Sequence, residues 1–302
     1  MLICIFIYFN SIFQQATASR PQKEKSFNEN TIFKTKYQNS SNSNIESSEE
    51  LLNIFKSLDY NLNKSSISYI KIPRLFIDKL PADFSKITSV EKRKLLFIKS
   101  ILPLILKENE KIENDRKKLI NFKKRLNQGK RLKEKDLLWL KGLTNFYELE
   151  LYDFKELLIK HDIVPPSLAL AQAIIESGWG TSRFARYGNA VFGQWTFKKG
   201  KGIIPLDRVI GKKHEVRTFE VLEDSVSHYI KNLNYHWAYN DFRMNRAKLR
   251  LYNQKINGYV LAEYLTRYSS KGDGYIKLLK SIINTNNLKN YDFVKLRKPI
   301  SS

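Results

Sequence analysis

The feature that most constrains this fold is a stretch that must form a helix with no polar face. Residues 168–175 read LALAQAII, so every position except Gln172 is apolar. Two prolines precede the stretch, where a missing N–H is tolerated at a helix start, and Gly178 follows it, where glycine favours a helix end. A helix that is apolar on all sides is buried. The rest of the chain therefore has to surround this helix.

Composition excludes two classes of protein and indicates a kind of partner. The 302 residues are enough for a large core, and 42% hydrophobic residues exclude a disordered chain. The 12 Gly and 8 Pro exclude a collagen-like one. Lysine and arginine total 53 against 30 acidic residues, a net charge of +23. This balance predicts an anionic partner, which could be nucleic acid, a membrane surface or an acidic polymer.

The first residues predict export. Residues 2–9 read LICIFIYF, too short for a membrane span of roughly 20 residues, and small residues follow at Ala16 and Ala18. We interpret residues 1–18 as a signal peptide, although no Lys or Arg precedes the apolar run, and an uncleaved anchor is the alternative. We therefore expect an exported protein of the periplasm or cell envelope, without a stable membrane span after cleavage. Cys4 is the only cysteine, so the mature chain would contain no disulfide or thiolate.

Composition divides the remaining chain into segments. Residues 19–50 are rich in Ser, Asn, Gln and Lys and are expected to form a flexible polar linker. Residues 51–134 are expected to form a basic helical region, 135–290 a globular and mostly helical domain, and 291–302 a tail. Within the domain, residues 197–219 contain three glycines around short apolar pieces and favour a hairpin-like lobe.

A charged helix is predicted before residue 135. It should begin near Thr88, because Thr88 and Glu91 have capping-box spacing, and Pro103 should kink or break it. A solvated helical face is the favoured interpretation of its basic residues, and a grip on a polyanion is the alternative. A narrow apolar stripe recurs at every seventh position, at Ile98, Ile105, Ile112, Leu119 and Leu126.

Glu176 is the best candidate for chemistry, because it occupies the last turn of the apolar helix. Burial and the negative end of the helix dipole both disfavour a charged carboxylate and raise its pKa. A carboxylic acid that stays protonated near neutral pH is what a glycosidase general acid requires. The following turn would place the indole of Trp179 beside the acid, where it could stack on a sugar. In the alternative, Glu176 pairs with Arg183 or Arg186 and only fastens the loop.

Several motifs resemble a known family. AIIESGWGTSRFAR at residues 173–186 is similar to the glucosaminidase domain of glycoside hydrolase family 73, most closely to its Bax-like branch. The Asn-x-x-Phe-Gly turn at residues 189–193, the stretch 219–250 and YSSKGDGY at residues 268–275 continue the resemblance in the same order.

The resemblance implies a fold and an activity. The implied fold class is mainly α (α+β), a lysozyme-like helical domain with a small β-hairpin lobe beside a glycan cleft, preceded here by a basic helical region. The implied activity is endo-β-N-acetylglucosaminidase cleavage of peptidoglycan, with glycan strands as the partner. By position, Glu176 matches the family's catalytic acid and Tyr268 matches a positioning or catalytic-support residue. A buried core tyrosine is the alternative for Tyr268.

The second catalytic group is left open. Hydrolysis needs a base, a nucleophile or the substrate's own N-acetyl group, and in this family the partner usually comes from the β-lobe. Asp207, Glu215 and Glu220 lie in or beside the predicted lobe, and Glu215 is favoured because it flanks the return strand of the hairpin. The separation of the two carboxyl groups decides between inversion and retention, so the sequence leaves the stereochemical course open.

Candidates for contact with the glycan are Trp179, Asn189, Phe192, Trp195 and Tyr229. Aromatic rings in this part of the chain could form the floor of sugar subsites or belong to the core. The four histidines lack metal-ligand spacing, so we expect neither a metal nor a cofactor. The sequence leaves the oligomeric state open.

Three other functions compete with this assignment. A lytic transglycosylase would share the single acid. A non-catalytic peptidoglycan-binding or scaffolding protein would keep the fold without the second carboxylate. Nucleic-acid binding would follow from the net charge alone. A signal peptide and a cysteine-free mature chain argue against the last function, so no nucleic-acid partner is expected.

Overall fold

The computed structural model describes residues 41–42, 45–62, 71–206, 208, 211 and 213–299. The predicted signal peptide and most of the predicted linker lie outside these residues. The helices are α1 (Ser48–Ser57), α2 (Val90–Asn127), α3 (Glu134–Tyr147), α4 (Phe154–Lys160), α5 (Pro166–Ser177), α6 (Arg183–Gly188), α7 (Leu222–Tyr235), α8 (Asn240–Leu251), α9 (Gly258–Leu261) and α10 (Asp273–Thr285). The strands are β1 (Ser41–Asn42), β2 (Lys71–Ile72), β3 (Phe76–Ile77), β4 (Trp195–Thr196), β5 (Gly202–Ile203), β6 (Glu215–Arg217) and β7 (Lys295–Leu296). Within this part of the chain, every helix is too short or too polar to cross a membrane.

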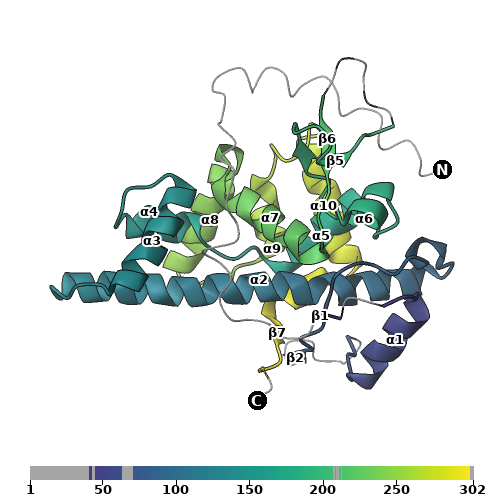
Figure 1. The fold of residues 1–302 in the computed structure, drawn as a ribbon, viewed down its shortest axis with the longest axis horizontal. Helices are drawn as coiled ribbons and strands as arrows, with labels where there is room; N and C mark the ends of the chain where they lie inside the picture. The colour runs from purple at the N-terminus through teal and green to yellow at the C-terminus, as the bar shows by residue number, and fades with distance from the viewer. Residues whose placement is uncertain are drawn as a thin grey trace.

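α2 is the longest element and runs along the whole molecule (Figure 1). Ser89 is its N-cap and accepts a hydrogen bond from the N–H of Lys92, so the cap predicted at Thr88 is wrong by one residue. The helix continues through Pro103, so the predicted break is also wrong. Its central turns are buried against neighbouring helices, and this packing outweighs the one backbone hydrogen bond that a proline removes. The predicted apolar stripe is confirmed by the buried residues Ile98, Ile105, Ile112 and Leu119.

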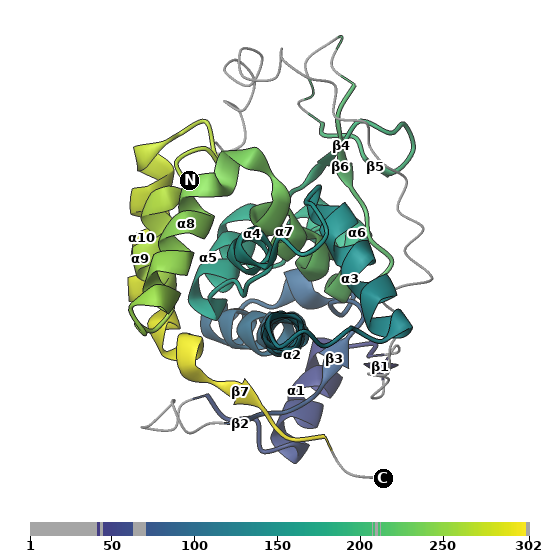
Figure 2. The ribbon, with the colours of Figure 1, turned by 90° about the vertical axis from the view of Figure 1, so that its left-hand side faces the viewer.

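α2 connects two hydrophobic cores. The larger core joins α1, α2, α5, α7, α10 and strands β3 and β7. The smaller core is formed by α3, α4 and the C-terminal half of α2. Figure 2 shows α2 end-on, with α1 and the paired strands β2 and β7 on one side and α5 and α7 on the other. The basic helical region and the globular domain, predicted as separate segments, therefore share one core.

Both ends of the described chain pack onto this core. α1 begins at Ser48, inside the segment predicted to be a flexible linker, and Ser47 caps it. β7 pairs in parallel with β2, with Lys295 opposite Lys71, and Val294 and Leu296 are buried. The predicted tail is therefore wrong for residues 291–299, which close the core and are not free.

The predicted β-lobe is a three-stranded antiparallel sheet in the order β4-β6-β5. Gly202 allows β5 to approach β6, because a Cβ at this position would lie only 2.3 Å from the carbonyl oxygen of Val216. The mainly helical, lysozyme-like fold class with a small β-lobe is confirmed.

A buried ionic cluster fixes the loop that leads into α5. Asp162 is 1% exposed, and its carboxylate accepts hydrogen bonds from Arg250 at 2.7 and 3.1 Å. Arg246 is fully buried and donates to the carbonyl oxygens of Asp162 and Ile163. Burial alone would raise the pKa of Asp162, but the positive charges of Arg246, Arg250 and Arg116 hold it below its usual range. The loop before α5 is therefore held by paired charges.

Two polar side chains fix the start of α5. The amide of Asn109 bonds the backbone of Val164 in both directions, at 2.8 and 3.1 Å. The carboxylate of Asp292 accepts hydrogen bonds from the N–H and the hydroxyl of Ser167 and from the N–H of Gly258. Because the start of a rigid helix is fixed, the position of its last turn is fixed as well.

Candidate active site

The end of α5 turns sharply beside Glu176. Gly178 caps the helix in the left-handed conformation at φ 57°, and Trp179 and Gly180 follow with φ 60° and 77°. Glycine tolerates this conformation, whereas a bulky residue such as tryptophan is strained in it. A Cβ on Gly180 would lie 2.6 Å from Cδ1 of Leu80, so only glycine can occupy this position without a shift. The turn leaves Glu176 partly buried in the last turn of α5.

The surroundings of Glu176 favour its protonated form. Burial raises the pKa of Glu176 to about 7, while a hydrogen bond from Tyr275 and the positive charge of Lys271 act in the opposite direction. The hydroxyl of Tyr275 donates to Oε1 of Glu176 at 3.1 Å. A carboxyl group with a pKa near 7 is protonated in about half of the molecules at neutral pH. Glu176 therefore has the proton affinity that a general acid needs.

The alternative role for Glu176, a fastener paired with an arginine, is contradicted. Arg183 donates to the carbonyl oxygen of Ile204, and Arg186 donates to the hydroxyl of Tyr187. Among the described residues, the hydrogen-bond partner of Glu176 is the tyrosine hydroxyl and neither of these two guanidinium groups.

Tyr268 packs against Tyr275, the tyrosine that contacts Glu176. Its ring stacks on Tyr275 with centroids 5.5 Å apart and contacts Tyr239 at 5.9 Å. Burial raises the pKa of Tyr268 and of Tyr275 well above that of an ordinary tyrosine, so both hydroxyls keep their protons. Tyr268 thus supports the ring that touches Glu176.

A chain of hydrogen bonds runs behind Glu176. The hydroxyl of Tyr229 donates to Oε1 of Gln172 at 2.6 Å, and Nε2 of Gln172 donates to the hydroxyl oxygen of Tyr275 at 3.1 Å. Gln172 is fully buried and lies four residues before Glu176, on the same face of α5. Sequence reasoning assigns no role to Gln172 or Tyr275. The available signal was weak: Gln172 is the one polar residue of the apolar helix, and Tyr275 ends the motif YSSKGDGY.

The second oxygen of Glu176, Oε2, lies near Gly193. Gly193, the last residue of the Asn-x-x-Phe-Gly turn, adopts φ 60°, and a Cβ there would lie 3.5 Å from Oε2 of Glu176. The absent side chain leaves room next to this oxygen.

Three of the five predicted glycan contacts are buried. Asn189 ends α6 in the left-handed conformation, and its amide donates to the carbonyl oxygens of Phe219 and Glu220. Phe192 and Tyr229 are 2% and 0% exposed, and their rings stack with centroids 3.9 Å apart. The protein interior covers these three side chains, which favours the alternative of a core position for the two aromatic rings.

Trp179 and Trp195 keep accessible surface. Trp179 packs edge-on against Phe97, with Nζ of Lys94 5.1 Å from its ring centroid. Trp195 stacks on His214 with centroids 4.3 Å apart. Both rings stay candidates for stacking on a sugar.

Glu215 lies in the lobe, on β6, and is 4% exposed. Its Oε1 accepts a hydrogen bond from the N–H of Gly200 at 3.1 Å, which ties β6 to the turn between β4 and β5. Its Oε2 is buried without a hydrogen-bond partner among the described residues. This oxygen has an unused capacity to accept a hydrogen bond. Of the other lobe candidates, Glu220 is exposed and Asp207 lies outside the described residues.

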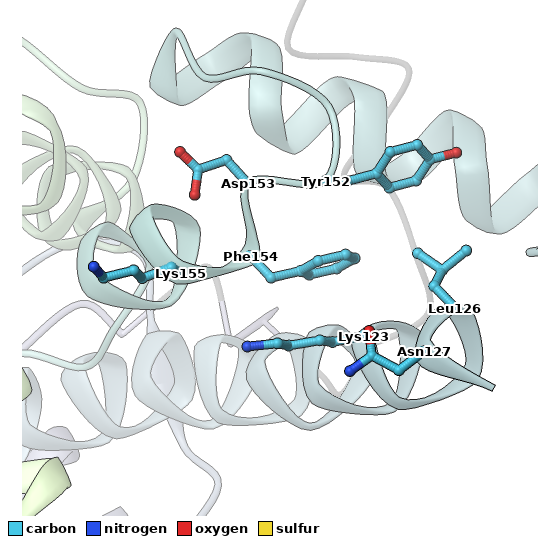
Figure 3. A pocket seen from close by; sticks show the side chains of 7 residues that line it. All are labelled: Lys123, Leu126, Asn127, Tyr152, Asp153, Phe154 and Lys155. Atoms are coloured by element: carbon cyan, nitrogen blue, oxygen red, sulfur yellow. The ribbon is translucent and has the colours of Figure 1, made fainter. Parts of the chain in front are cut away.

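A cavity of about 450 Å³ lies at the C-terminal end of α2 (Figure 3). In Figure 3 the ring of Phe154 extends above α2, between Tyr152 and Lys123, while the carboxylate of Asp153 points away from the ring. The cavity is lined by Lys123, Leu126, Asn127, Tyr152, Asp153, Phe154 and Lys155. None of the predicted site residues is among them, so the candidate chemistry stays with Glu176.

Comparison with known proteins identifies the family. Residues 152–288 match the glucosaminidase family described as mannosyl-glycoprotein endo-beta-N-acetylglucosaminidase. The chain is 32% identical over 206 residues to protein bax of Escherichia coli (strain K12), an alignment that covers 68% of this chain and 73% of that protein. It is also similar to the catalytic domain of the autolysin Auto from Listeria monocytogenes, at 19% identity over 50% of this chain and 84% of that domain, with a TM-score of 0.33. The matched family segment contains Glu176 and the hydrogen-bond chain behind it. The chain therefore belongs to the glucosaminidase family and is Bax-like within it.

Proposed function

We propose that this protein hydrolyses peptidoglycan as an endo-β-N-acetylglucosaminidase, with Glu176 as the general acid. The observation that carries the proposal is the carboxyl group of Glu176 at the end of a fixed helix, where burial raises its pKa to about 7 and keeps about half of it protonated at neutral pH. Membership of a glucosaminidase family supports glycoside hydrolysis at this position.

In the proposed reaction, Glu176 donates its proton to the glycosidic oxygen on the reducing side of N-acetylglucosamine as the C–O bond breaks. The leaving sugar departs as an alcohol, and the hydrogen bond from Tyr275 supports the carboxylate that stays behind. Water then adds to the anomeric carbon and gives up a proton to a carboxylate base. Trp179 and Trp195 are proposed to stack on sugar rings, and Tyr268 to hold the aromatic wall beside the acid.

We propose Glu215 as the group that assists the water. Its buried Oε2 is free to accept a hydrogen bond, and a carboxylate from the lobe would complete the pair that glycoside hydrolysis needs. Glu215→Gln should then abolish turnover, whereas Glu220→Gln, an exposed neighbour in the same lobe, should leave turnover unchanged. The reverse pattern would assign the role to Glu220.

We also propose that the protein acts in the cell envelope after export. The net charge of +23 would concentrate it on an anionic polymer such as peptidoglycan, whose stem peptides carry carboxylates. Amino-terminal sequencing of the protein recovered from the envelope should start at Ser19. A start at Met1 would favour the uncleaved anchor.

Digestion of purified sacculi tests the assignment of the acid. The wild type should release fragments with new reducing-end N-acetylglucosamine, and Glu176→Gln should slow release by a factor of about 10²–10⁴. Glu263→Gln removes an exposed carboxylate that pairs with Lys280 and is the matched control. Equal release by wild type and Glu176→Gln would remove Glu176 from its role.

The end groups of the same digests separate the competing functions. Anhydro-muramyl ends would identify a lytic transglycosylase, since that reaction uses the sugar's own hydroxyl in place of water. Binding to sacculi without any new end group would identify a non-catalytic scaffolding protein.

A further inference from the structure

The hydrogen-bond chain behind Glu176 has one direction. Nε2 of Gln172 can only donate, so the hydroxyl oxygen of Tyr275 accepts from it and the tyrosine proton is free to point at Glu176. Oε1 of Gln172 can only accept, and it takes the proton of Tyr229. Because each hydroxyl has a single proton, the orientation of the Gln172 amide sets the donor and acceptor in every hydrogen bond from Tyr229 to Glu176.

This direction distinguishes the two oxygens of Glu176. Oε1 accepts the proton of Tyr275, so the acid's own proton is favoured on the other oxygen. That oxygen, Oε2, is the one next to Gly193, where a Cβ would lie 3.5 Å away. The proton therefore faces the space that the missing side chain of Gly193 leaves.

Aromatic stacking keeps the members of the chain in place. Tyr229 lies parallel to Phe192, with 4° between the ring planes, and Tyr275 lies parallel to Tyr268, with 12° between them. Tyr229 is 0% exposed and Tyr275 is 3% exposed. Neither hydroxyl can swing away from Gln172 without unstacking a ring from its neighbour.

Gln172 is also out of keeping with its surroundings. It is fully buried in an otherwise apolar stretch of α5, where an apolar residue would avoid the cost of desolvating an amide. Both ends of its amide are instead used, one by each tyrosine. A polar side chain placed here connects Tyr229 and Tyr275 across the helix that carries the acid.

We propose that Gln172 and Tyr275 are positioning residues that hold the proton of Glu176 on Oε2, facing Gly193. This inference rests on the proposed role of Glu176 as a general acid. When that proton passes from Oε2 to the glycosidic oxygen and the C–O bond breaks, Tyr275 keeps its own proton and continues to donate to Oε1. The same hydroxyl thus orients the acid before transfer and stabilises the carboxylate after it.

Two variants of the full-length protein test the hydrogen-bond chain by kinetics. Tyr275→Phe removes one hydroxyl and should lower kcat about tenfold, leave KM nearly unchanged and move the alkaline limb of the pH profile upward by about one unit. Gln172→Met keeps the length of the side chain and should produce a smaller change in the same direction. Tyr147→Phe removes a hydroxyl that is buried in the smaller core and contacts His161, and it should change neither kcat, nor KM, nor the alkaline limb.

A second readout does not depend on activity. The carboxyl carbon of Glu176 can be titrated by NMR in selectively labelled protein, with its signal assigned by its loss in Glu176→Gln. The midpoint should rise in Tyr275→Phe and rise less in Gln172→Met, because each change weakens the support of the carboxylate. If the wild type does not cleave peptidoglycan, the proposed function fails. This titration still reports whether the hydrogen-bond chain acts on Glu176.

A Tyr275→Phe protein with the wild-type titration midpoint and alkaline limb would refute the proposed positioning role, even if kcat fell. A purely structural role lowers activity without moving the midpoint or the limb. If Tyr275→Phe does not fold, an unchanged titration midpoint in Gln172→Met would refute the positioning role instead.

Discussion

Gly193 lies beside Glu176 in the candidate site, so that a Cβ added to Gly193 would be 3.5 Å from Oε2 and 3.9 Å from Cβ of Glu176. The glycine also adopts φ 60°, a conformation that side chains with a Cβ disfavour. The backbone at Gly193 therefore disfavours a side chain, and any side chain placed there would pack directly against the carboxyl group of Glu176.

Gly193→Ala should therefore reduce both stability and activity. The left-handed conformation costs an alanine about 1–2 kcal/mol, measurable by urea unfolding. The added methyl group would occupy the space in front of Oε2 and should lower kcat/KM on sacculi by at least about tenfold. Gly129→Ala is the matched control, since Gly129 has φ 72° with no atom within 4 Å of its added Cβ. It should lose similar stability and keep full activity; equal activity in both variants would contradict a role for the space at Gly193.

Activity should fall as pH rises through about 7. The general acid must be protonated to act, and the pKa of Glu176 is about 7 because of burial. The rate of muropeptide release, measured between pH 5 and 9 under saturating substrate, should give a descending limb at this pH. A rate that increases through the same range would mean that Glu176 acts as a base.

Glu176→Gln should be more stable than the wild type at high pH. The pKa of Glu176 in the folded protein, about 7, lies above its ordinary value of 4.5, so the folded state binds this proton more tightly than the unfolded state. The resulting stabilisation is fully present below pH 4.5 and is lost as pH rises to 7, a change of about 3 kcal/mol. Glutamine does not titrate, so the variant should have a Tm several degrees above the wild type at pH 8. At pH 4.5 this advantage should shrink, and an equal difference at both pH values would exclude titration of Glu176 as its cause.

Asp162→Asn should destabilise the fold strongly. The substitution removes the negative charge that neutralises the buried Arg246 and accepts two hydrogen bonds from Arg250. Breaking a buried ion pair from one side costs about 3–5 kcal/mol, which urea unfolding would detect. Glu110→Gln, which removes the partly exposed partner of Arg74, should cost clearly less. A loss below about 1 kcal/mol in Asp162→Asn would show that the cluster is not essential to the core.

The sequence predicts the parts of the site that depend on a local pattern. The apolar run at residues 168–175 predicts a buried helix, and glycine at position 178 predicts its end, so Glu176 is found at its correct place in the last turn. Phe192 and Tyr229 are different, because an aromatic ring has the same sequence pattern whether it floors a cleft or fills a core. Only the packing of the two rings against each other decides that they are buried.

Other features depend on contacts between distant segments. Pro103 has the local signature of a helix break, but burial against other helices keeps α2 continuous through it. Gln172 and Tyr275 are 103 residues apart, so their hydrogen bond has no local signal in the sequence. The alternatives at these positions could be decided only by the three-dimensional structure.

The continuity of α2 limits how this architecture can be rearranged. Its 38 residues extend about 57 Å, and turns near one end and near the other belong to different cores. The segment that matches the glucosaminidase family therefore depends on a helix outside its own bounds. A fusion protein that contains residues 152–288 would also need α2 in the same register. Without α2, the face of α5 that packs against it would be exposed to water.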